Sequence, residues 1–126
     1  FICGFRTADE VVSGEIFESL DPEICTDDGT RGHAGTTVDY LNKLIAGAPI
    51  KDGQAVLYAC GPMPMLQGCH EAAAGSGLSC FVSAEQVMAC GVGACMGCVI
   101  RVKHGVGYAR VCRDCPVFNS DELLWT

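Results

Sequence analysis

Short apolar runs alternate with helical patterns over the first two thirds of the chain. The runs at residues 1–6, 23–26, 54–59 and 79–83 have the composition of strands buried in a sheet. Between them, apolar residues repeat at helical spacing from Thr36 to near Gly47, and again from Met65 to Gly75 or Gly77. This alternation predicts an α/β fold with a parallel sheet and right-handed crossovers, which ends at about residue 84.

The segment 7–20 carries mixed helix signals. Thr7 is followed three residues later by Glu10, which is the pattern of a capping box. Gly14 weakens any continuous helix across the segment. We therefore expect one broken helix or two short helices here.

The pattern changes after residue 84. Residues 85–98 are rich in Gly, Ala, Met and Cys and have no period, which predicts a loop. The segments 99–103 and 107–111 alternate as the two strands of a hairpin. The tail 116–126 is irregular, with at most a short helical turn. We therefore divide the chain into an α/β domain, residues 1–84, and a small cysteine-rich module, residues 85–126.

Composition narrows the class of function. Of the 126 residues, 49% are hydrophobic and 18% charged, which is typical of a globular domain. The net charge of −7 argues against a nucleic acid or an anionic membrane surface as the partner. Gly, Pro or a charge interrupts every apolar stretch before the ~20 residues of a membrane span, so we expect no membrane partner. The chain starts with Phe1 and no signal peptide pattern follows, so we expect an internal piece of a longer protein.

The ten cysteines fall into two groups. Half of them are scattered, mostly in or beside apolar runs, where thiols are usually small core residues. The scattered group is Cys3, Cys25, Cys60, Cys69 and Cys80. The other five crowd between residues 90 and 115, and such a grouping holds a metal more often than disulfides. This distribution indicates a reducing, cytoplasmic compartment.

The clustered cysteines have a specific spacing. Cys90, Cys95, Cys98 and Cys112 follow C-x4-C-x2-C-x13-C, and the first three have the spacing of plant-type [2Fe–2S] ferredoxins. Such a loop must wrap the cluster tightly, and the glycines between these cysteines permit that. A structural zinc site on the pairs 95/98 and 112/115 is an alternative, as are disulfides or inert thiols. Cys115 could also replace the fourth ligand.

A dinucleotide-binding α/β domain normally opens with a strand and a Gly-rich phosphate turn, and both are missing here. Either this domain binds no dinucleotide, or its first βα unit lies upstream of Phe1. In the second case the sheet has an unpaired edge, and we expect self-association, strand exchange between chains or low stability.

Several motifs together resemble one family. Residues 88–98 (Met-Ala-Cys-Gly-Val-Gly-Ala-Cys-Met-Gly-Cys), 108–114 (Tyr-Ala-Arg-Val-Cys-Arg-Asp) and 116–118 (Pro-Val-Phe) resemble the C-terminus of the electron-transfer subunit of class 1B dihydroorotate dehydrogenase. Upstream, Gly4-Phe5-Arg6, residues 26–29 (Thr-Asp-Asp-Gly) and residues 58–62 (Tyr-Ala-Cys-Gly-Pro) are similar to the pyridine-nucleotide half of that subunit and of ferredoxin reductases. The resemblance covers nearly the whole chain, and it departs from the family at Cys115, where Gly is usual.

The resemblance implies a function for the chain and its longer protein. It implies a partial NAD-binding sheet of the ferredoxin-reductase type, followed by a [2Fe–2S] module with Cys90, Cys95, Cys98 and Cys112 as ligands. Electrons would pass from dihydroorotate and the FMN of a catalytic subunit through the cluster to FAD and then NAD+, in pyrimidine (UMP) biosynthesis. The family forms a heterotetramer. A missing N-terminal domain would bind most of the FAD, so this fragment alone would be inactive.

The resemblance also implies nucleotide contacts. Cys60, Gly61 and Pro62 would face the nicotinamide and flavin from a strand end, and Gly4 and Arg6 would lie near the adenosine of NAD. No nucleophile–base pair points to covalent catalysis, and we expect no catalytic residue in this chain. Two alternatives stay open: a related NAD(P)H–flavin reductase subunit with another partner, and a zinc-binding interaction module without a redox role.

Two other candidate features have plainer interpretations. Asp27 and Asp28 fit a turn with an Asx hydrogen bond better than a ribose contact. The three histidines share no metal-binding spacing and are expected to be solvated or structural. They are His33, His70 and His104.

Overall fold

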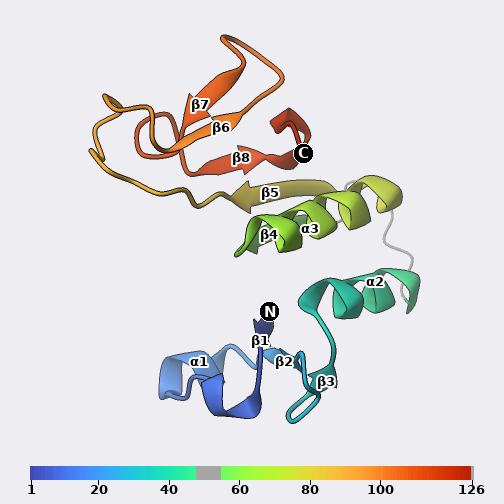
Figure 1. Cartoon of the computed structure of the whole chain (residues 1–126). Coiled ribbons are helices and arrows are strands. Elements are labelled where there is room, and N and C mark those ends of the chain that lie inside the picture. Colours follow the sequence, from blue (N-terminus) through green and yellow to red (C-terminus); the bar gives the residue numbers. More distant parts are fainter. Residues whose placement is uncertain (48–54, 126) are drawn as a thin grey trace. The chain divides into compact units, whose positions relative to one another are not determined.

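The computed structural model describes residues 1–47 and 55–125, in two compact units, Phe1–Pro49 and Ile50–Thr126 (Figure 1). The boundary between residues 84 and 85, expected between a nucleotide-binding α/β part and a cluster-binding module, stays a prediction. Within the described residues, no helix combines the length and the apolar character that crossing a membrane requires.

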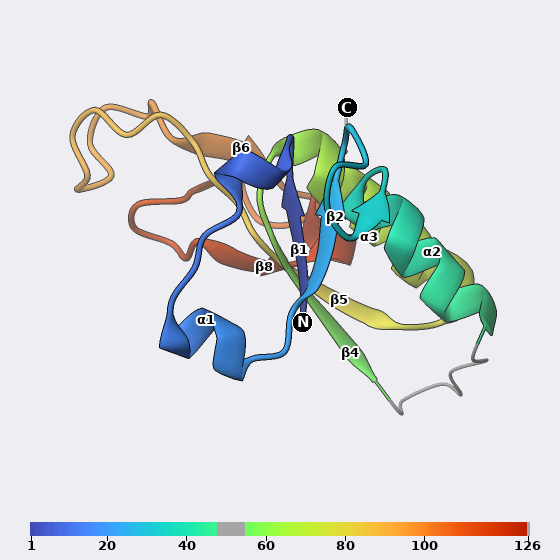
Figure 2. The ribbon, with the colours of Figure 1, turned by 90° about the horizontal axis from the view of Figure 1, so that it is seen from below.

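The first unit is built on a small parallel sheet. Its elements are β1 (Ile2–Phe5), the 3-10 helix η1 (Ala8–Glu10), α1 (Glu15–Ser19), β2 (Glu23–Thr26), β3 (His33–Ala34) and α2 (Thr37–Gly47). β1 and β2 run side by side, with Ile2 opposite Glu23, and β3 pairs with the other edge of β2 (Figure 2). The two-residue β3 was not predicted, because a strand of this length has too few residues to show a pattern.

The segment 7–20 contains two short helices, as expected, but the predicted capping box is wrong. The Thr7 side chain makes no cap hydrogen bond. The Glu10 carboxylate instead accepts from the backbone N–H of Arg6 at 3.2 Å and pairs with the Arg6 guanidinium, with Nη2 and Oε1 2.8 Å apart. A charged donor forms a stronger hydrogen bond with a carboxylate than a neutral backbone N–H does.

The helix predicted from Thr36 is confirmed as α2, and a true capping box begins it. The Asp39 backbone N–H donates to Thr36 Oγ1 at 3.1 Å. In return, Asp39 Oδ2 accepts from the backbone N–H of Thr36 at 2.9 Å and from its hydroxyl at 2.7 Å. Thr36 Oγ1 therefore satisfies the backbone N–H of Asp39, in the first turn of α2. The Asp39 carboxylate satisfies the backbone N–H of Thr36, which precedes the helix.

The second unit combines a βαβ motif with the cysteine-rich hairpin. Its elements are β4 (Val56–Cys60), α3 (Met63–Ser76), β5 (Ser79–Ser83), β6 (Val99–Arg101), β7 (Tyr108–Arg110), β8 (Val117–Asn119) and the 3-10 helix η2 (Ser120–Glu122). β4 and β5 are parallel, and α3 packs against both (Figure 1). β6 and β7 form the predicted hairpin, and residues 85–98 form the predicted loop. The first residue of the predicted strand 54–59, Gln54, lies outside the described residues.

The tail is more ordered than the sequence pattern predicted. β8 pairs antiparallel with β5, with Phe118 opposite Val82, and the Ala84 N–H donates to the Pro116 carbonyl oxygen at 2.8 Å. The tail therefore returns to the α/β sheet after the hairpin. A three-residue strand carries too little alternation to be predicted, and it forms here because β5 offers a free edge.

The core of this unit lies between α3 and the β5–β8 pair. It is made of Leu66, Cys69, Ala73, Cys80, Val82 and Phe118, all buried. Burial raises the pKa of the Cys69 thiol to about 11, which keeps it neutral. Cys25 is also buried, in the first unit. The interpretation of the scattered cysteines as core residues is thus confirmed for Cys25, Cys69 and Cys80, whereas Cys60 is exposed.

Candidate metal centre

The first pair of predicted ligands lies within the loop. Cys90 Sγ accepts from the backbone N–H groups of Ala94 at 3.3 Å and Cys95 at 3.4 Å. The Cys95 N–H is the main cause that lowers the pKa of the Cys90 thiol to about 6, and a hydrogen bond with the Cys95 side chain adds to it. The loop therefore favours the thiolate form of Cys90, which is the form that binds metals.

The second pair lies where the hairpin opens. Cys98 directly precedes β6 and Cys112 follows β7 by two residues. The Val111 N–H donates to the Cys98 carbonyl oxygen at 3.1 Å, and the Cys112 N–H donates to Cys98 Sγ at 3.5 Å. The Cys112 backbone N–H lowers the pKa of the Cys98 thiol, while a side-chain hydrogen bond with Cys98 raises the pKa of Cys112. Pairing in the hairpin thus brings together two cysteines that are far apart in the sequence.

The backbone between Cys90 and Cys95 needs glycine. Gly91 and Gly93 have φ of +67° and +78°, in the left-handed region that other residues avoid. A Cβ on Gly93 would also lie 2.8 Å from Arg113 Cδ. Met96 takes a φ of +62° without being glycine, which is a strained position. The Gly97 N–H next to it donates to Cys95 Sγ at 3.4 Å, so the strained turn aims a donor at a sulfur.

One side chain joins the loop to the hairpin, and sequence reasoning assigned it no role. The Arg110 guanidinium donates to Asp114 through Nε at 3.1 Å and Nη2 at 3.1 Å, and through Nη1 to the Gly93 carbonyl oxygen at 3.1 Å. Asp114 also accepts from the Arg110 backbone N–H at 2.8 Å. The spacing of an Arg and an Asp four residues apart was the available signal. Nothing in the sequence pointed to Gly93 as the second partner.

The contacts sort the four predicted ligands into two pairs. Among residues 1–47 and 55–125, the structure assembles no group of three or more His, Cys, Asp or Glu side chains that could hold a metal ion. Contacts group Cys90 with Cys95 and Cys98 with Cys112, whereas the zinc alternative would group 95 with 98 and 112 with 115. Each iron of a [2Fe–2S] cluster takes two of the four cysteine thiolates. Cys115 is exposed, and its sulfur accepts from the Val117 N–H at 3.3 Å.

Three of the expected nucleotide contacts lie in the second unit. Cys60, Gly61 and Pro62 occupy the carboxyl end of β4 and the start of α3, with Pro62 at the N-cap. The carboxyl ends of parallel strands are where open α/β sheets bind ligands. Gly61 has a φ of +156°, and a Cβ there would lie 2.6 Å from Met65 Cε.

The other two expected contacts, Gly4 and Arg6, lie in the first unit at the carboxyl end of β1. Packing by itself accounts for glycine at position 4, because a Cβ would lie 2.6 Å from Thr37 Cγ2 of α2. Arg6 is exposed and paired with Glu10. The assignment of both residues to NAD stays a prediction. The Asx interpretation of Asp28 is confirmed, because Asp28 Oδ1 accepts from the Thr30 N–H at 3.0 Å.

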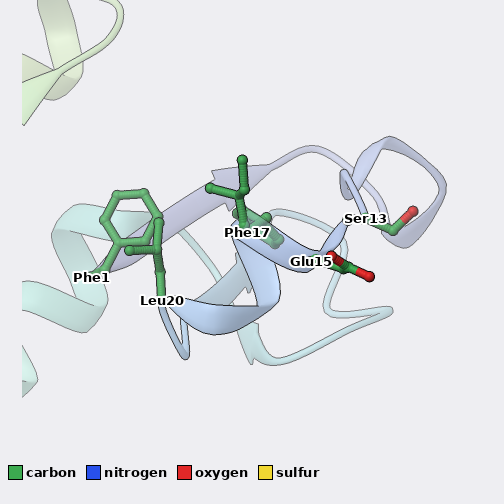
Figure 3. Close-up of a pocket in the computed structure, with 7 residues that line it drawn as sticks. Phe1, Ser13, Glu15, Phe17 and Leu20 are labelled. Carbon is green, nitrogen blue, oxygen red and sulfur yellow. The ribbon is translucent and has the colours of Figure 1, made fainter.

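An open, mostly apolar pocket of about 560 Å³ lies in the first unit beside Phe1, which precedes β1. Phe1, Phe17 and Leu20 line it, and the rings of Phe1 and Phe17 meet edge to face with centroids 6.5 Å apart (Figure 3). None of the predicted site residues lines this pocket.

Comparison with known proteins shows what these features are similar to. Residues 85–124 match the iron–sulfur cluster binding domain of dihydroorotate dehydrogenase B. The chain is similar to the electron transfer subunit of dihydroorotate dehydrogenase B (NAD(+)) from Caldanaerobacter subterraneus subsp. tengcongensis, with 38% identity over 88% of this chain and 44% of that protein. The same subunit from Fusobacterium nucleatum subsp. nucleatum is 36% identical over 97% of this chain and 46% of that protein. The chain thus spans less than half the length of these relatives.

A solved structure has the same fold. A chain of an NADH-dependent reduced ferredoxin-NADP oxidoreductase, solved in a study of flavin-based electron bifurcation, matches 98% of this chain. The TM-score is 0.74, the identity is 25%, and 43% of that chain is covered. This match confirms the predicted α/β fold of the ferredoxin-reductase type. Residues 85–124 therefore resemble the iron–sulfur cluster binding domain of dihydroorotate dehydrogenase B, within a chain similar along nearly its whole length to the electron transfer subunits of that enzyme.

Proposed function

We propose that this chain is part of an electron-transfer subunit in which Cys90, Cys95, Cys98 and Cys112 hold a [2Fe–2S] cluster. The observation that carries the proposal is the presentation of these cysteines as two pairs, one within the loop and one at the open end of the hairpin. Backbone N–H groups donate to the sulfurs of Cys90, Cys95 and Cys98. Such donors stabilise the negative charge of cysteine-bound clusters and set their potential.

The chain's own residues would bind and shape the cluster rather than react. When bound, the cluster takes up and releases single electrons. The glycines let the loop turn its N–H groups toward the sulfurs, and Arg110 fixes the loop to the hairpin through Gly93. No residue of the chain is proposed to be catalytic.

In the longer protein, we assign the chain a place in a full electron path. Electrons from dihydroorotate would pass from an FMN-containing catalytic subunit through the cluster to FAD and then to NAD+, in the cytoplasm, as a step of pyrimidine biosynthesis. A heterotetramer of the two subunits is the assembly we propose, with no nucleic acid or membrane partner. Cys60, Gly61 and Pro62 would contact the nicotinamide and flavin, and Gly4 and Arg6 the adenosine of NAD. A segment outside this chain would bind most of the FAD, so the chain alone would be inactive.

A second candidate is a related NAD(P)H–flavin reductase subunit with a different partner. The likeness to a reduced ferredoxin-NADP oxidoreductase supports it. The dependence of NAD+ reduction on dihydroorotate distinguishes the two candidate functions. If the complex isolated around the full-length protein reduces NAD+ only when dihydroorotate is supplied, the first candidate holds. Reduction that depends on another donor supports the second.

The deciding experiment is to measure iron and acid-labile sulfide per chain, with a visible spectrum, on protein purified without oxygen. We expect about two irons, two sulfides and a red-brown colour. Replacing Cys90, Cys95, Cys98 or Cys112 with Ser should reduce the iron content, the sulfide content and the colour. The matched control is Cys115→Ser, at an exposed cysteine of the same module, and it should leave them unchanged. One zinc per chain without sulfide would overturn the proposal in favour of a structural zinc module.

A further inference from the structure

The end of the chain is fastened to α3 by a connected group of side chains. His70 Nδ1 and Ser120 Oγ lie 3.0 Å apart, and Ser120 is only 2% exposed. The Trp125 ring stacks on the His70 ring, with centroids 5.2 Å apart and planes 21° from parallel. The Trp125 indole N–H donates to the Ser120 carbonyl oxygen at 2.9 Å. These three residues close a small ring of contacts between α3 and the tail.

The same stretch of tail is bonded to the hairpin through its backbone. The Leu124 N–H donates to the Arg101 carbonyl oxygen at 3.0 Å. The Lys103 N–H donates to the Glu122 carbonyl oxygen at 2.8 Å, and a β-bridge joins Val102 to Leu123. Residues 122–124 therefore bind the turn end of the hairpin, while residues 120 and 125 bind α3.

The opposite end of this hairpin carries the Cys98 and Cys112 pair. A two-stranded hairpin is marginally stable by itself and takes its orientation from what it packs on. The tail therefore links α3, whose first turn follows Cys60, Gly61 and Pro62, to the strands that present two of the four proposed ligands.

A catalytic role for this group does not fit its geometry. Ser120 Oγ, at 3.0 Å, and Asp121 Oδ1, at 3.6 Å, both approach the same ring nitrogen of His70, Nδ1. A nucleophile, base and acid in series need the two partners on opposite ring nitrogens. Ser120 is also buried, so no substrate reaches it. The group is suited to hold the tail in place.

We propose that His70, Ser120 and Trp125 form a tail strap that holds the hairpin in a fixed orientation to α3, and thereby positions the Cys98 and Cys112 pair. The three are positioning residues. The claim that the strap positions Cys98 and Cys112 for a cluster rests on the proposed function. The strap as a set of contacts between α3 and the tail does not. Without the strap, residues 122–124 separate more readily from the hairpin, and the cysteine pair loses its fixed relation to the loop.

The first test is amide hydrogen exchange at Lys103 and Leu124 in the chain. Ser120→Ala and His70→Phe both remove the Nδ1–Ser120 hydrogen bond, and His70→Phe keeps a ring for Trp125 to stack on. Both should speed exchange at these two amides about fivefold, the effect of losing one buried hydrogen bond. His70→Asn keeps a hydrogen-bonding group near the Nδ1 position but removes the ring on which Trp125 stacks, so it should retain only part of the protection.

Ser76→Ala is the matched control. It makes the same chemical change on α3, where the Ser76 hydroxyl donates to the Ala72 carbonyl oxygen at 2.6 Å, without touching the tail. Exchange at Lys103 and Leu124 should not change. Unchanged exchange in Ser120→Ala would overturn the strap. Equal acceleration in Ser76→Ala would also overturn it, because the effect would then be general destabilisation.

The second test uses full-length protein loaded with iron and sulfide, and follows iron release to a chelator. Ser120→Ala should release iron several-fold faster, with His70→Asn between that rate and the wild-type rate and Ser76→Ala unchanged. If Ser120→Ala speeds amide exchange but not iron release, the strap holds the tail without positioning the cluster. That result would overturn the claim that the strap positions the Cys98 and Cys112 pair. If the wild-type protein binds no cluster, the proposed function fails, while the exchange experiment still decides the strap.

Discussion

The Arg110 guanidinium donates to the Gly93 carbonyl oxygen at 3.1 Å and so joins two segments that carry different cysteine pairs. Gly93 lies between Cys90 and Cys95, and Arg110 lies two residues before Cys112. The bidentate contact with Asp114 fixes the orientation of the guanidinium plane. This single side chain therefore couples the loop pair to the hairpin pair.

Replacing Arg110 with Lys should weaken cluster retention. A lysine ammonium keeps the positive charge but lacks the planar fork, so it cannot bind both Asp114 oxygens and the Gly93 carbonyl together. We expect several-fold faster iron release to a chelator. The control is Arg101→Lys, on an exposed arginine of β6, which should release iron at the wild-type rate. Equal rates for the two variants would show that Arg110 acts only through its charge.

Gly4→Ala should destabilise the first unit by about 1–3 kcal/mol, because the new Cβ would lie 2.6 Å from Thr37 Cγ2 and push α2 from β1. Urea unfolding measures the loss. The second substitution Thr37→Ser removes the methyl group in question and should restore most of the stability. If the double variant is as unstable as Gly4→Ala, the close approach of α2 is not the reason for glycine here.

The α2 capping box should lose its stabilising effect in acid. Hydrogen bonds from the Thr36 hydroxyl and backbone N–H lower the pKa of the Asp39 carboxyl. A carboxyl with a lowered folded-state pKa contributes stability above its unfolded pKa of about 3.9, and loses it as pH falls through the folded pKa. Asp39→Asn should therefore be less stable than wild type at pH 7, and the gap should close toward pH 3.

Urea midpoints at both pH values measure this gap. Asp9→Asn, which removes another carboxylate of the first unit outside the capping box, is the control for the general effect of losing one negative charge. A gap between wild type and Asp39→Asn that persists unchanged at pH 3 would contradict the role of the Asp39 charge.

The chain alone should self-associate. Among the described residues, β1 pairs only with β2 and β4 only with β5, so each has one edge without a strand. Such edges pair with other chains. Light scattering after size exclusion should show dimers or larger species.

A charge on the edge should reduce this association. Val56→Lys, at a half-exposed position of β4, should shift the population toward monomer. Val106→Lys, at an exposed position in the hairpin turn, should not. A stable monodisperse wild-type monomer would exclude association through these edges.

Local sequence was sufficient wherever the structure depends on neighbours in the chain. The helix α2 that follows Thr36, the strands around residues 2–5 and 79–83 and the loop 85–98 all follow from short-range spacing. The cysteine spacing likewise pointed to Cys90, Cys95, Cys98 and Cys112 as candidate ligands, with Cys115 as an alternative fourth ligand, and this assignment stays a prediction. The capping box at Thr7 failed because Arg6 competes for the same carboxylate, and a capping pattern takes no account of such a competitor.

Contacts between distant residues needed the tertiary structure. His70 and Ser120 are 50 positions apart, and Arg110 and Gly93 are 17 apart. β8 forms only because β5 leaves an edge open to it. A helix or a tight loop is determined by backbone geometry over a few residues, so its pattern is visible in the sequence. A strand pairing or a long-range hydrogen bond depends on which surfaces the folded chain brings together, and no spacing in the sequence records that.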